Sequence, residues 1–223
     1  MQEEVDKIKK AYFNRKKIEA SGKLNHAMYS SYIAAEREKI YETIIQKSFS
    51  NLKNRRLIEI GAGGGSNIEF FHQLGISYSN IFANELIDER INDLKKKFPE
   101  INVLEGNAMD IKIDSKFDIV FQSTVFTSIL NDDMQLAVAK KMWEVLSDDG
   151  IILWYDFVYN NPNNKDVRKV SRKRIKALFP NGTMFTFIKV TLAPPIGRRV
   201  GKMYPFFNTF KFLRTHLIAV IRK

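Results

Sequence analysis

A run of glycines directly after a short apolar segment is the pattern in this sequence best suited to chemistry. Residues 56–60 read Arg-Leu-Ile-Glu-Ile, and glycines follow at positions 61, 63, 64 and 65. Glycine lets the backbone approach a ligand closely, and a helix that begins after such a turn favours negative charge at its N-terminus. A dinucleotide fingerprint that starts at Gly61 needs a further glycine at position 66, where the chain has Ser66. The spacing therefore disfavours a nicotinamide dinucleotide.

Polar residues also end the next two predicted strands. Glu85 ends the second strand, 24 residues after Gly61, where a carboxylate can accept hydrogen bonds from both hydroxyls of a ribose. Asn107 and Ala108 lie in the turn after the third strand, a turn that suits the edge of an adenine. The order and spacing of these features predict a nucleoside cofactor more strongly than any one of them does.

The elements that must position these residues alternate between strand and helix. Apolar runs predict strands at 56–60, 101–105, 117–122 and 151–155, a further strand that ends at 84–85, and helices at 88–97 and 131–146. Such alternation predicts a parallel sheet whose ligands bind beyond the carboxyl ends of the strands. Residues 3–49 are predicted to be helical with a break near Ser21-Gly22, as a packed cap or as a lid. A basic helix at 165–178, a strand at 185–192 that Pro194-Pro195 stops, and a strand at 214–221 follow.

Composition excludes several kinds of site. The chain has no cysteine, which excludes disulfides, thiolate metal sites and every mechanism with a cysteine nucleophile. Its three histidines, His26, His72 and His216, are far apart in sequence, so we expect no metal site. The chain has no apolar run long enough to span a bilayer, and its N-terminus lacks the apolar stretch of a signal peptide. We therefore expect a cytoplasmic protein.

Charge is distributed unevenly along the chain. Residues 167–223 hold fourteen Lys and Arg and no Asp or Glu, whereas the preceding residues hold 22 basic and 25 acidic residues, which gives the net charge of +11. Within this part, 196–213 mixes basic and aromatic residues, which suits either an amphiphilic partner or ordinary packing on the sheet. We expect either a solvated basic surface, or a C-terminal part that faces an anionic acceptor or contacts a membrane surface through 196–213.

Residues 56–155 resemble the catalytic core of the class I S-adenosylmethionine-dependent methyltransferases, with the glycine motif at Glu59–Gly65 and the ribose acid at Glu85. Asn107 stands where the family commonly has Asp, and an amide can still hydrogen-bond to adenine. The resemblance implies one α/β domain over 1–223, with a Rossmann-like, seven-stranded, mostly parallel sheet, an antiparallel last strand and helices on both faces. It implies a helical cap or lid at 1–50, a cofactor-binding core at 51–160 and a basic, acceptor-facing part at 161–223.

Further motifs resemble those of a bacterial subgroup that is often encoded among genes for cell-surface polysaccharides. They lie at 121–129, 154–157, 160–162, 191–195 and 214–216. The segment Tyr12-Phe13-Asn14-Arg15 resembles the subgroup's N-terminal Tyr-x-x-Arg, which we expect over the methionine carboxylate of S-adenosylmethionine. The predicted cofactor-binding residues are Tyr12, Arg15, Glu59, Gly61, Gly63, Gly65, Glu85, Leu86, Asn107, Ala108 and Gln122.

Methyl transfer from a sulfonium is an in-line displacement, which needs alignment, exclusion of water and, for a hydroxyl or protonated amine acceptor, a base. Asp156, just past the fifth strand, and His26, in the helical region, are the candidate catalytic residues. The alternative roles are a loop cap for Asp156 and a surface position for His26. Ser123 and Thr124 follow Gln122 at the end of the fourth strand and are expected to border the methyl group.

The predicted function is methyl transfer to a small or carrier-linked acceptor: a sugar, a nucleotide-sugar or a surface-glycan intermediate. The alternative, suggested by the basic tail, is an RNA methyltransferase that acts on ribose or base, with nucleic acid the less favoured partner. The fourth-strand sequence Gln122-Ser123-Thr124-Val125 differs from the Asn/Asp-Pro-Pro-Tyr/Phe motif with which adenine-N6 enzymes hold a flipped base. Ser66 disfavours a nicotinamide dehydrogenase, and the intact glycine loop disfavours a non-catalytic binding module.

Overall fold

The computed structural model describes residues 1–19, 25–161 and 164–223, and the side chains of residues 15–26 lie outside the described part. Its seven-stranded sheet has the order β3-β2-β1-β4-β5-β7-β6. Strands β1 to β5 pair in parallel, and β7 pairs antiparallel with both β5 and β6. The strands are β1 Leu57–Ile60, β2 Ile81–Glu85, β3 Asn102–Glu105, β4 Phe117–Ser123, β5 Leu146–Phe157, β6 Met184–Leu192 and β7 Arg214–Arg222. The predicted mostly parallel sheet with an antiparallel last strand is confirmed.

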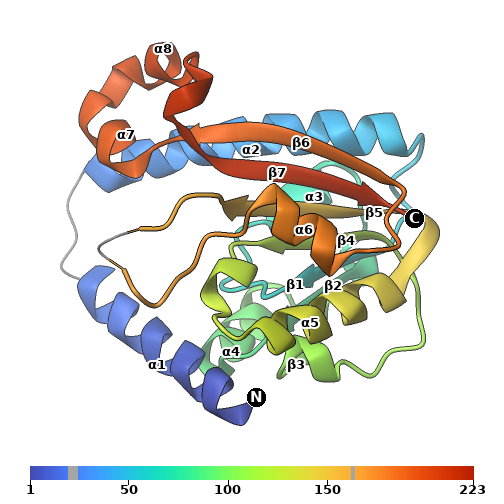
Figure 1. The fold of residues 1–223 in the computed structure, drawn as a ribbon. Helices are drawn as coiled ribbons and strands as arrows, with labels where there is room; N and C mark the ends of the chain where they lie inside the picture. The colour runs from blue at the N-terminus through green and yellow to red at the C-terminus, as the bar shows by residue number, and fades with distance from the viewer. Residues whose placement is uncertain (20–24, 162–163) are drawn as a thin grey trace.

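Helices cover both faces of this sheet (Figure 1). One face packs against α2, α3 and α4, and the other against α1, α5 and α6. The smaller helices α7 and α8 form a projection beside the N-terminal end of α2, near the C-terminal end of β6 (Figure 1). The helices are α1 Gln2–Glu19, α2 Asn25–Ser48, α3 Ile68–Gln73, α4 Asp88–Lys97, α5 Asp132–Val145, α6 Arg172–Leu178, α7 Pro194–Val200 and α8 Tyr204–Asn208.

The central strands are apolar on both sides because both of their faces are buried. Ile151, Leu153 and Tyr155 of β5 pack on the face that α2 and α3 cover. Ile152 and Trp154 alternate with them and pack beneath α5 and α6. This two-sided burial is the property expected of a parallel sheet between helical layers.

Register places the functional turns at one edge of the sheet. Ile60 at the end of β1 pairs with Asn84 on one side and with Gln122 on the other. Glu85 pairs with Glu105, the last residue of β3. The glycine loop, the residues after β2, the turn after β3 and the end of β4 therefore converge, as the parallel topology requires.

One local expectation for the C-terminal part is wrong. The basic helix begins only at Arg172, after the N-cap Ser171, and not at 165. The residues before it stay outside the helix because their N–H groups bond elsewhere: Arg168 donates to Thr127 O and Val170 donates to Phe157 O. The strand expected to stop at Pro194-Pro195 does end there, at Leu192. The two prolines also begin α7, at positions where a helix makes no hydrogen bond to the backbone nitrogen.

Among the helices of the described residues, none has the length and apolar character needed to cross a bilayer.

Candidate functional site

The glycine loop after β1 needs glycine for two separate reasons. Gly61, Gly63 and Gly65 have φ angles of 65°, 60° and 75°, in the left-handed region that other residues rarely adopt. A Cβ on Gly61 would lie 2.6 Å from Val125 Cγ2, and a Cβ on Gly65 would lie 2.7 Å from the Phe98 ring. The loop therefore runs close to the end of β4 on one side and to the core on the other.

Glu59 supports this loop from below. Its side chain is buried, and its Oε1 accepts a hydrogen bond of 2.6 Å from Asn67 Nδ2, across the loop. Its Oε2 has no partner among the described residues. Burial raises the pKa of Glu59 to about 8, and the bond from Asn67 opposes that rise. The carboxyl is therefore mostly protonated at neutral pH, unless a ligand brings it a positive charge.

Glu85 organises the loops around it through both of its carboxylate oxygens. Oε2 accepts from Gly63 N at 2.6 Å, and Oε1 accepts from Leu86 N and Ile87 N, each at 2.9 Å. These three backbone donors fix the position of the carboxylate at the end of β2. A carboxylate offers about four lone-pair directions, so Glu85 keeps acceptor capacity for a ribose hydroxyl.

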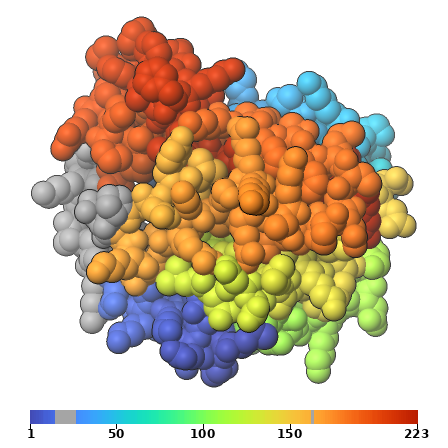
Figure 2. All heavy atoms as spheres, viewed as in Figure 1, coloured from blue at the N-terminus to red at the C-terminus, as the bar shows by residue number. Residues whose placement is uncertain are grey.

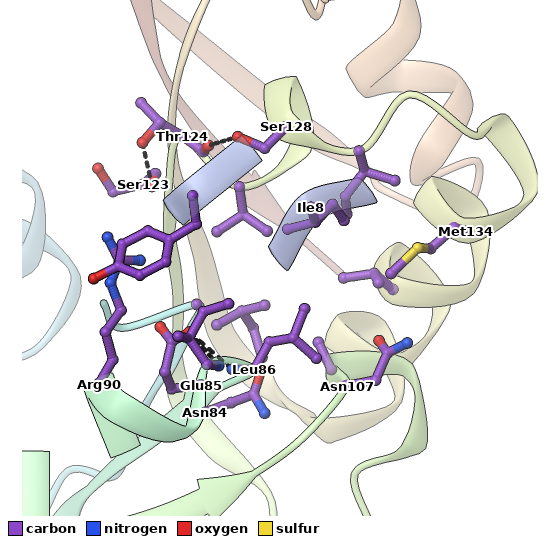
Figure 3. A pocket seen from close by; sticks show the side chains of 18 residues that line it. Ile8, Asn84, Glu85, Leu86, Arg90, Asn107, Ser123, Thr124, Ser128 and Met134 are labelled. Atoms are coloured by element: carbon purple, nitrogen blue, oxygen red, sulfur yellow. Dashed lines mark hydrogen bonds between the residues drawn. The ribbon is translucent and has the colours of Figure 1, made fainter. Parts of the chain in front are cut away.

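A cavity of about 250 Å³ lies at this edge of the sheet, and α1 covers it with Ile8 and Tyr12 (Figure 3). Glu85 and Arg90 lie together on one side of it, Ser123 and Thr124 at the end of β4, and Asn107 and Met134 on the opposite side (Figure 3). The lining residues are Ile8, Tyr12, Ile60, Gly61, Asn84, Glu85, Leu86, Ile87, Arg90, Asn107, Ala108, Ser123, Thr124, Val125, Ser128, Ile129, Met134 and Val138.

The cavity has a polar part and an apolar part. Ile8, Leu86 and Met134 supply an apolar slot beside the Asn107 turn, where a flat base would be held between aliphatic side chains. The side chain of Asn107 accepts from Met109 N at 3.2 Å, which leaves its amide N–H groups as donors. A nucleoside fits this division: its base in the slot, its ribose against Glu85.

Tyr12 and Arg90 close the polar side of the cavity together. The guanidinium carbon of Arg90 lies 3.9 Å from the centroid of the Tyr12 ring, a cation–π contact between α1 and α4. Arg90 Nη1 also lies 3.6 Å from the position that a Cβ on Gly63 would take. Sequence reasoning missed Arg90; its place in the first turn of the helix after β2 was the available signal.

Gln122 braces the turn that ends β4 without lining the cavity. Its side chain is fully buried; Oε1 accepts from Val125 N at 3.0 Å and Nε2 donates to Tyr155 O at 3.3 Å. Thr124 has a φ of 60°, which is unusual for a non-glycine residue, and its N–H donates to Tyr155 O at 2.8 Å. These bonds hold Ser123 and Thr124 at the cavity wall.

Asp156 lies behind Gln122 and away from the cavity. Its side chain is 1% exposed, and Gln122 Nε2 donates to its Oδ2 at a long 3.5 Å. Burial raises the pKa of Asp156 to about 7, while hydrogen bonds from Thr127 and Gln122 oppose the rise. Asp156 is thus a buried, readily protonated group one side chain removed from the wall.

The structure brings together some of the residues that the sequence predicts to bind the cofactor. Six of the predicted cofactor-binding residues line the cavity: Tyr12, Gly61, Glu85, Leu86, Asn107 and Ala108. Four others, Glu59, Gly63, Gly65 and Gln122, lie outside its lining and shape the loops around it. The side chains of Arg15 and His26 lie outside the described residues.

A second polar group from α2 reaches the same edge of the sheet. Arg37 Nη1 donates to Ser123 Oγ at 3.3 Å, and its guanidinium carbon lies 4.8 Å from the centroid of the Tyr155 ring. His216 stacks on that same ring at 5.1 Å. Burial, with the nearby charge of Arg37, lowers the pKa of His216 to about 4, so it is neutral. Among the described ion pairs none includes Arg37, and its Nε has no hydrogen-bond partner there.

One family model matches the stretch of the chain that contains this site. Residues 58–154 match the family model described as a methyltransferase domain. The matched stretch begins in β1 and ends in β5, so it includes the glycine loop, Glu85, the Asn107 turn and the end of β4.

Solved structures, among them those of two methyltransferases, share the fold. Magnesium protoporphyrin IX methyltransferase (ChlM) from Synechocystis PCC 6803, with bound SAH, aligns at a TM-score of 0.62 and 11% identity over 98% of this chain and 97% of its own. DesVI from Streptomyces venezuelae aligns at 0.56 and 15% identity over 91% and 100%. A SAM-dependent methyltransferase from Archaeoglobus fulgidus aligns at 0.58 and 15% identity over 83% and 94%. At these identities the likeness establishes the fold.

One curated relative is a dehydrogenase and not a methyltransferase. Shikimate dehydrogenase (NADP(+)) from Pelagibacter ubique (strain HTCC1062) is 24% identical over 145 residues, which are 65% of this chain and 49% of that protein. The chain thus spans about half the length of this curated relative. Ser66, where the dinucleotide fingerprint needs glycine, disfavours a nicotinamide dinucleotide in this loop, and NADP(+) is the ligand against which the site must be tested.

Proposed function

We propose that this protein transfers a methyl group from S-adenosylmethionine to a sugar, nucleotide-sugar or surface-glycan intermediate that carries negative charge. S-adenosylmethionine is the methyl donor. The methyltransferase domain supports the reaction class, and the glycine loop locked to Glu85 by the Gly63 N–H is the observation that carries the donor assignment. The resemblance of residues 121–216 to the bacterial subgroup supports the class of acceptor.

The proposed pose of the donor follows the division of the cavity. Leu86, Ala108 and Met134 hold the adenine, with Asn107 as its hydrogen-bond partner. Glu85 accepts from a ribose hydroxyl. The methionine part passes Gly61 beneath Tyr12, and Arg15 of the same helix is proposed as the partner of the methionine carboxylate.

One buried group fits the positive end of the donor. The Oε2 atom of Glu59 lacks a partner in the described residues and lies beneath the glycine loop, so a donor ammonium group would complete its bonding. Gly61 lets the donor pass without a side chain in the way. S-adenosylmethionine supplies an electrophilic methyl on a sulfonium; the chain's own residues bind the donor, exclude water and receive a proton.

In the transfer step the lone pair of an acceptor oxygen or nitrogen bonds to the methyl carbon while the carbon–sulfur bond breaks. The bonding electrons stay on sulfur, which gives S-adenosylhomocysteine. A hydroxyl acceptor also loses its proton. Asp156, behind Gln122, is the proposed recipient, because its raised pKa of about 7 suits proton uptake near neutral pH. The Gln122 amide does not pass protons on, so the proton would have to reach Asp156 through a water molecule. His26 is the other candidate.

The acceptor is proposed to lie on the α2 side of Ser123. Arg37 hydrogen-bonds there to Ser123, a residue of the cavity wall, and has no ion-pair partner among the described residues. A phosphate or carboxylate of the acceptor would pair with it. In this arrangement residues 1–50 act as cap or lid, 51–160 as the cofactor core and 161–223 as the acceptor-facing part.

Methyl uptake from labelled S-adenosylmethionine tests the proposal directly. Nucleotide-sugars, sugar phosphates, glycan intermediates and RNA are compared as acceptors. With an accepted anionic sugar, Arg37→Gln should raise its KM on the order of tenfold while donor affinity stays constant, since one charge-assisted hydrogen bond is lost. Lys39→Gln is the matched control, because Lys39 is an exposed cation on the same helix.

Two outcomes would contradict the proposed acceptor. Efficient methylation of RNA with a steep loss at raised salt would favour the RNA methyltransferase. Equal KM values for wild type and Arg37→Gln would remove Arg37 from the acceptor site.

A further inference from the structure

The projection formed by α7, α8 and the short turns beside them exposes an aromatic surface. Met203, Phe206, Phe210 and Phe212 are 56%, 58%, 40% and 75% exposed. The Phe210 ring centroid lies 5.6 Å from that of Phe206 and 5.9 Å from that of Phe212, so the three rings form one continuous ridge. Figure 2 shows residues of this part of the chain as a raised knob, at the upper left in orange and red.

Exposed cations border this ridge and have no acidic neighbours in sequence. Arg198, Arg199, Lys202 and Lys211 are all exposed. None of them forms an ion pair among the described residues. Residues 167–223 contain no Asp or Glu that could neutralise them. The surface is therefore apolar at its centre and positive around it.

The projection is held in place by a partly buried polar anchor. Glu36 of α2 accepts from Thr191 N, from the Tyr204 hydroxyl and from Asn208 Nδ2, at 3.0, 3.2 and 2.8 Å. The Tyr204 ring stacks on Tyr32 at 4.9 Å with an interplanar angle of 1°. These contacts fix the projection to α2, so the fold itself holds the phenylalanine rings in exposed positions.

We propose that this aromatic and basic surface docks on an anionic lipid bilayer. Phenylalanine side chains enter the boundary between headgroups and acyl chains, and Lys and Arg around them pair with anionic headgroups. The inference goes beyond the proposed methyl transfer and does not depend on the acceptor.

A second copy of the chain fits this surface less well. A twofold interface would bring each patch against itself, four cations against four, with no acidic residue of 167–223 to pair with them. RNA also fits less well. Phe206 and Phe210 meet edge to face at 83°, so the two rings do not form a parallel platform on which successive bases could stack.

Co-sedimentation with vesicles tests the docking. The full chain is mixed with vesicles of phosphatidylcholine alone and with vesicles that also contain phosphatidylglycerol. We expect binding to the mixed vesicles, and weak or no binding to phosphatidylcholine alone. Lys202→Gln with Lys211→Gln should lower the partition coefficient roughly 25-fold, at roughly fivefold for each cation. Phe210→Ser with Phe212→Ser should lower it at least roughly tenfold.

Matched controls separate docking from general charge and exposure. Lys96→Gln with Lys112→Gln removes the same charge from exposed positions elsewhere, and Met184→Ser removes an exposed apolar side chain that is 56% exposed on β6. Both should bind vesicles as the wild type does. Urea midpoints and S-adenosylhomocysteine affinity, measured for every variant, report whether the fold and the donor site are intact.

The proposal is overturned if the wild type does not bind anionic vesicles. It is overturned as well if the lysine and phenylalanine double variants bind these vesicles as well as the control variants do. It is also overturned if the chain forms a dimer that only the phenylalanine variants abolish, since a second copy would then be the occupant. Preferential binding of an RNA oligonucleotide over anionic vesicles, lost in the same variants, would assign the surface to nucleic acid instead.

Discussion

Replacing Gly61 with alanine should damage the cavity far more than the same change at Gly64. Gly61 has a φ of 65°, and left-handed backbone costs alanine roughly 1–2 kcal/mol. The new Cβ would also lie 2.6 Å from Val125 Cγ2, and such overpacking costs about 1–3 kcal/mol. The two terms add to about 2–5 kcal/mol, divided between the free energy of unfolding and the free energy of donor binding.

Gly64→Ala is the matched control within the same loop. A Cβ at Gly64 would meet nothing within 4 Å, and Gly64 is not among the glycines with positive φ. Its substitution should change the free energy of unfolding by no more than about 0.5 kcal/mol. Urea unfolding gives the stability term for each variant, and calorimetric titration with S-adenosylhomocysteine, under conditions where both are folded, gives the binding term. Equal behaviour of the two variants in both assays would refute the geometry assigned to the loop.

Further predictions concern single carboxyl groups. Glu85→Gln should weaken S-adenosylhomocysteine binding roughly ten- to a hundredfold, because charge-assisted hydrogen bonds of about 1.5–3 kcal/mol are lost, and an unchanged Kd in calorimetry would show that Glu85 is not the ribose acid. Asp156 keeps its proton up to a pKa of about 7 when folded and loses it near pH 3.9 when unfolded, so wild-type stability should fall as pH rises through this window. In Asp156→Asn this decline in stability should be smaller. If the free energy of unfolding from urea titrations fell with pH equally in wild type and variant, that would argue against the raised pKa of Asp156. Glu36→Gln should lower the free energy of unfolding by about 1–3 kcal/mol through its three donors, whereas exposed Glu42→Gln should leave it within about 0.5 kcal/mol, and equal urea midpoints would discount the anchor.

The alternation of strands and helices, and the edge of the sheet that carries the site, could be predicted from sequence. Apolar runs such as 117–122 have no polar alternation, which identifies strands buried on both faces, and parallel strands place their following turns together. Glu85 and Asn107 were predicted at that edge for this reason. Strand bounds were less accurate: β5 runs from Leu146 to Phe157, because Leu146 already pairs with Phe117.

The face of the sheet or helix on which a side chain lies was harder to predict than the residue's position at a strand end or in a helix. Asp156 follows Tyr155 at a strand end, yet strand alternation puts it on the face of Trp154, behind Gln122. Arg90 lines the cavity and Arg37 contacts its wall at Ser123 because of how α4 and α2 are rotated against the sheet, which periodicity alone does not determine. The helix expected from 165 begins at Arg172 because long-range bonds to Thr127 and Phe157 hold the preceding residues outside the helix.

Calorimetric titration of the unmodified chain with S-adenosylhomocysteine and, separately, with NADP(+) tests the central claim most directly. The account predicts that S-adenosylhomocysteine binds with one site per chain and that NADP(+) gives no heat of binding. It further predicts that S-adenosylhomocysteine at about 100 times its Kd stabilises the fold by roughly 2.7 kcal/mol. Binding of NADP(+) without binding of S-adenosylhomocysteine would contradict the assignment of this cavity to a methyl donor.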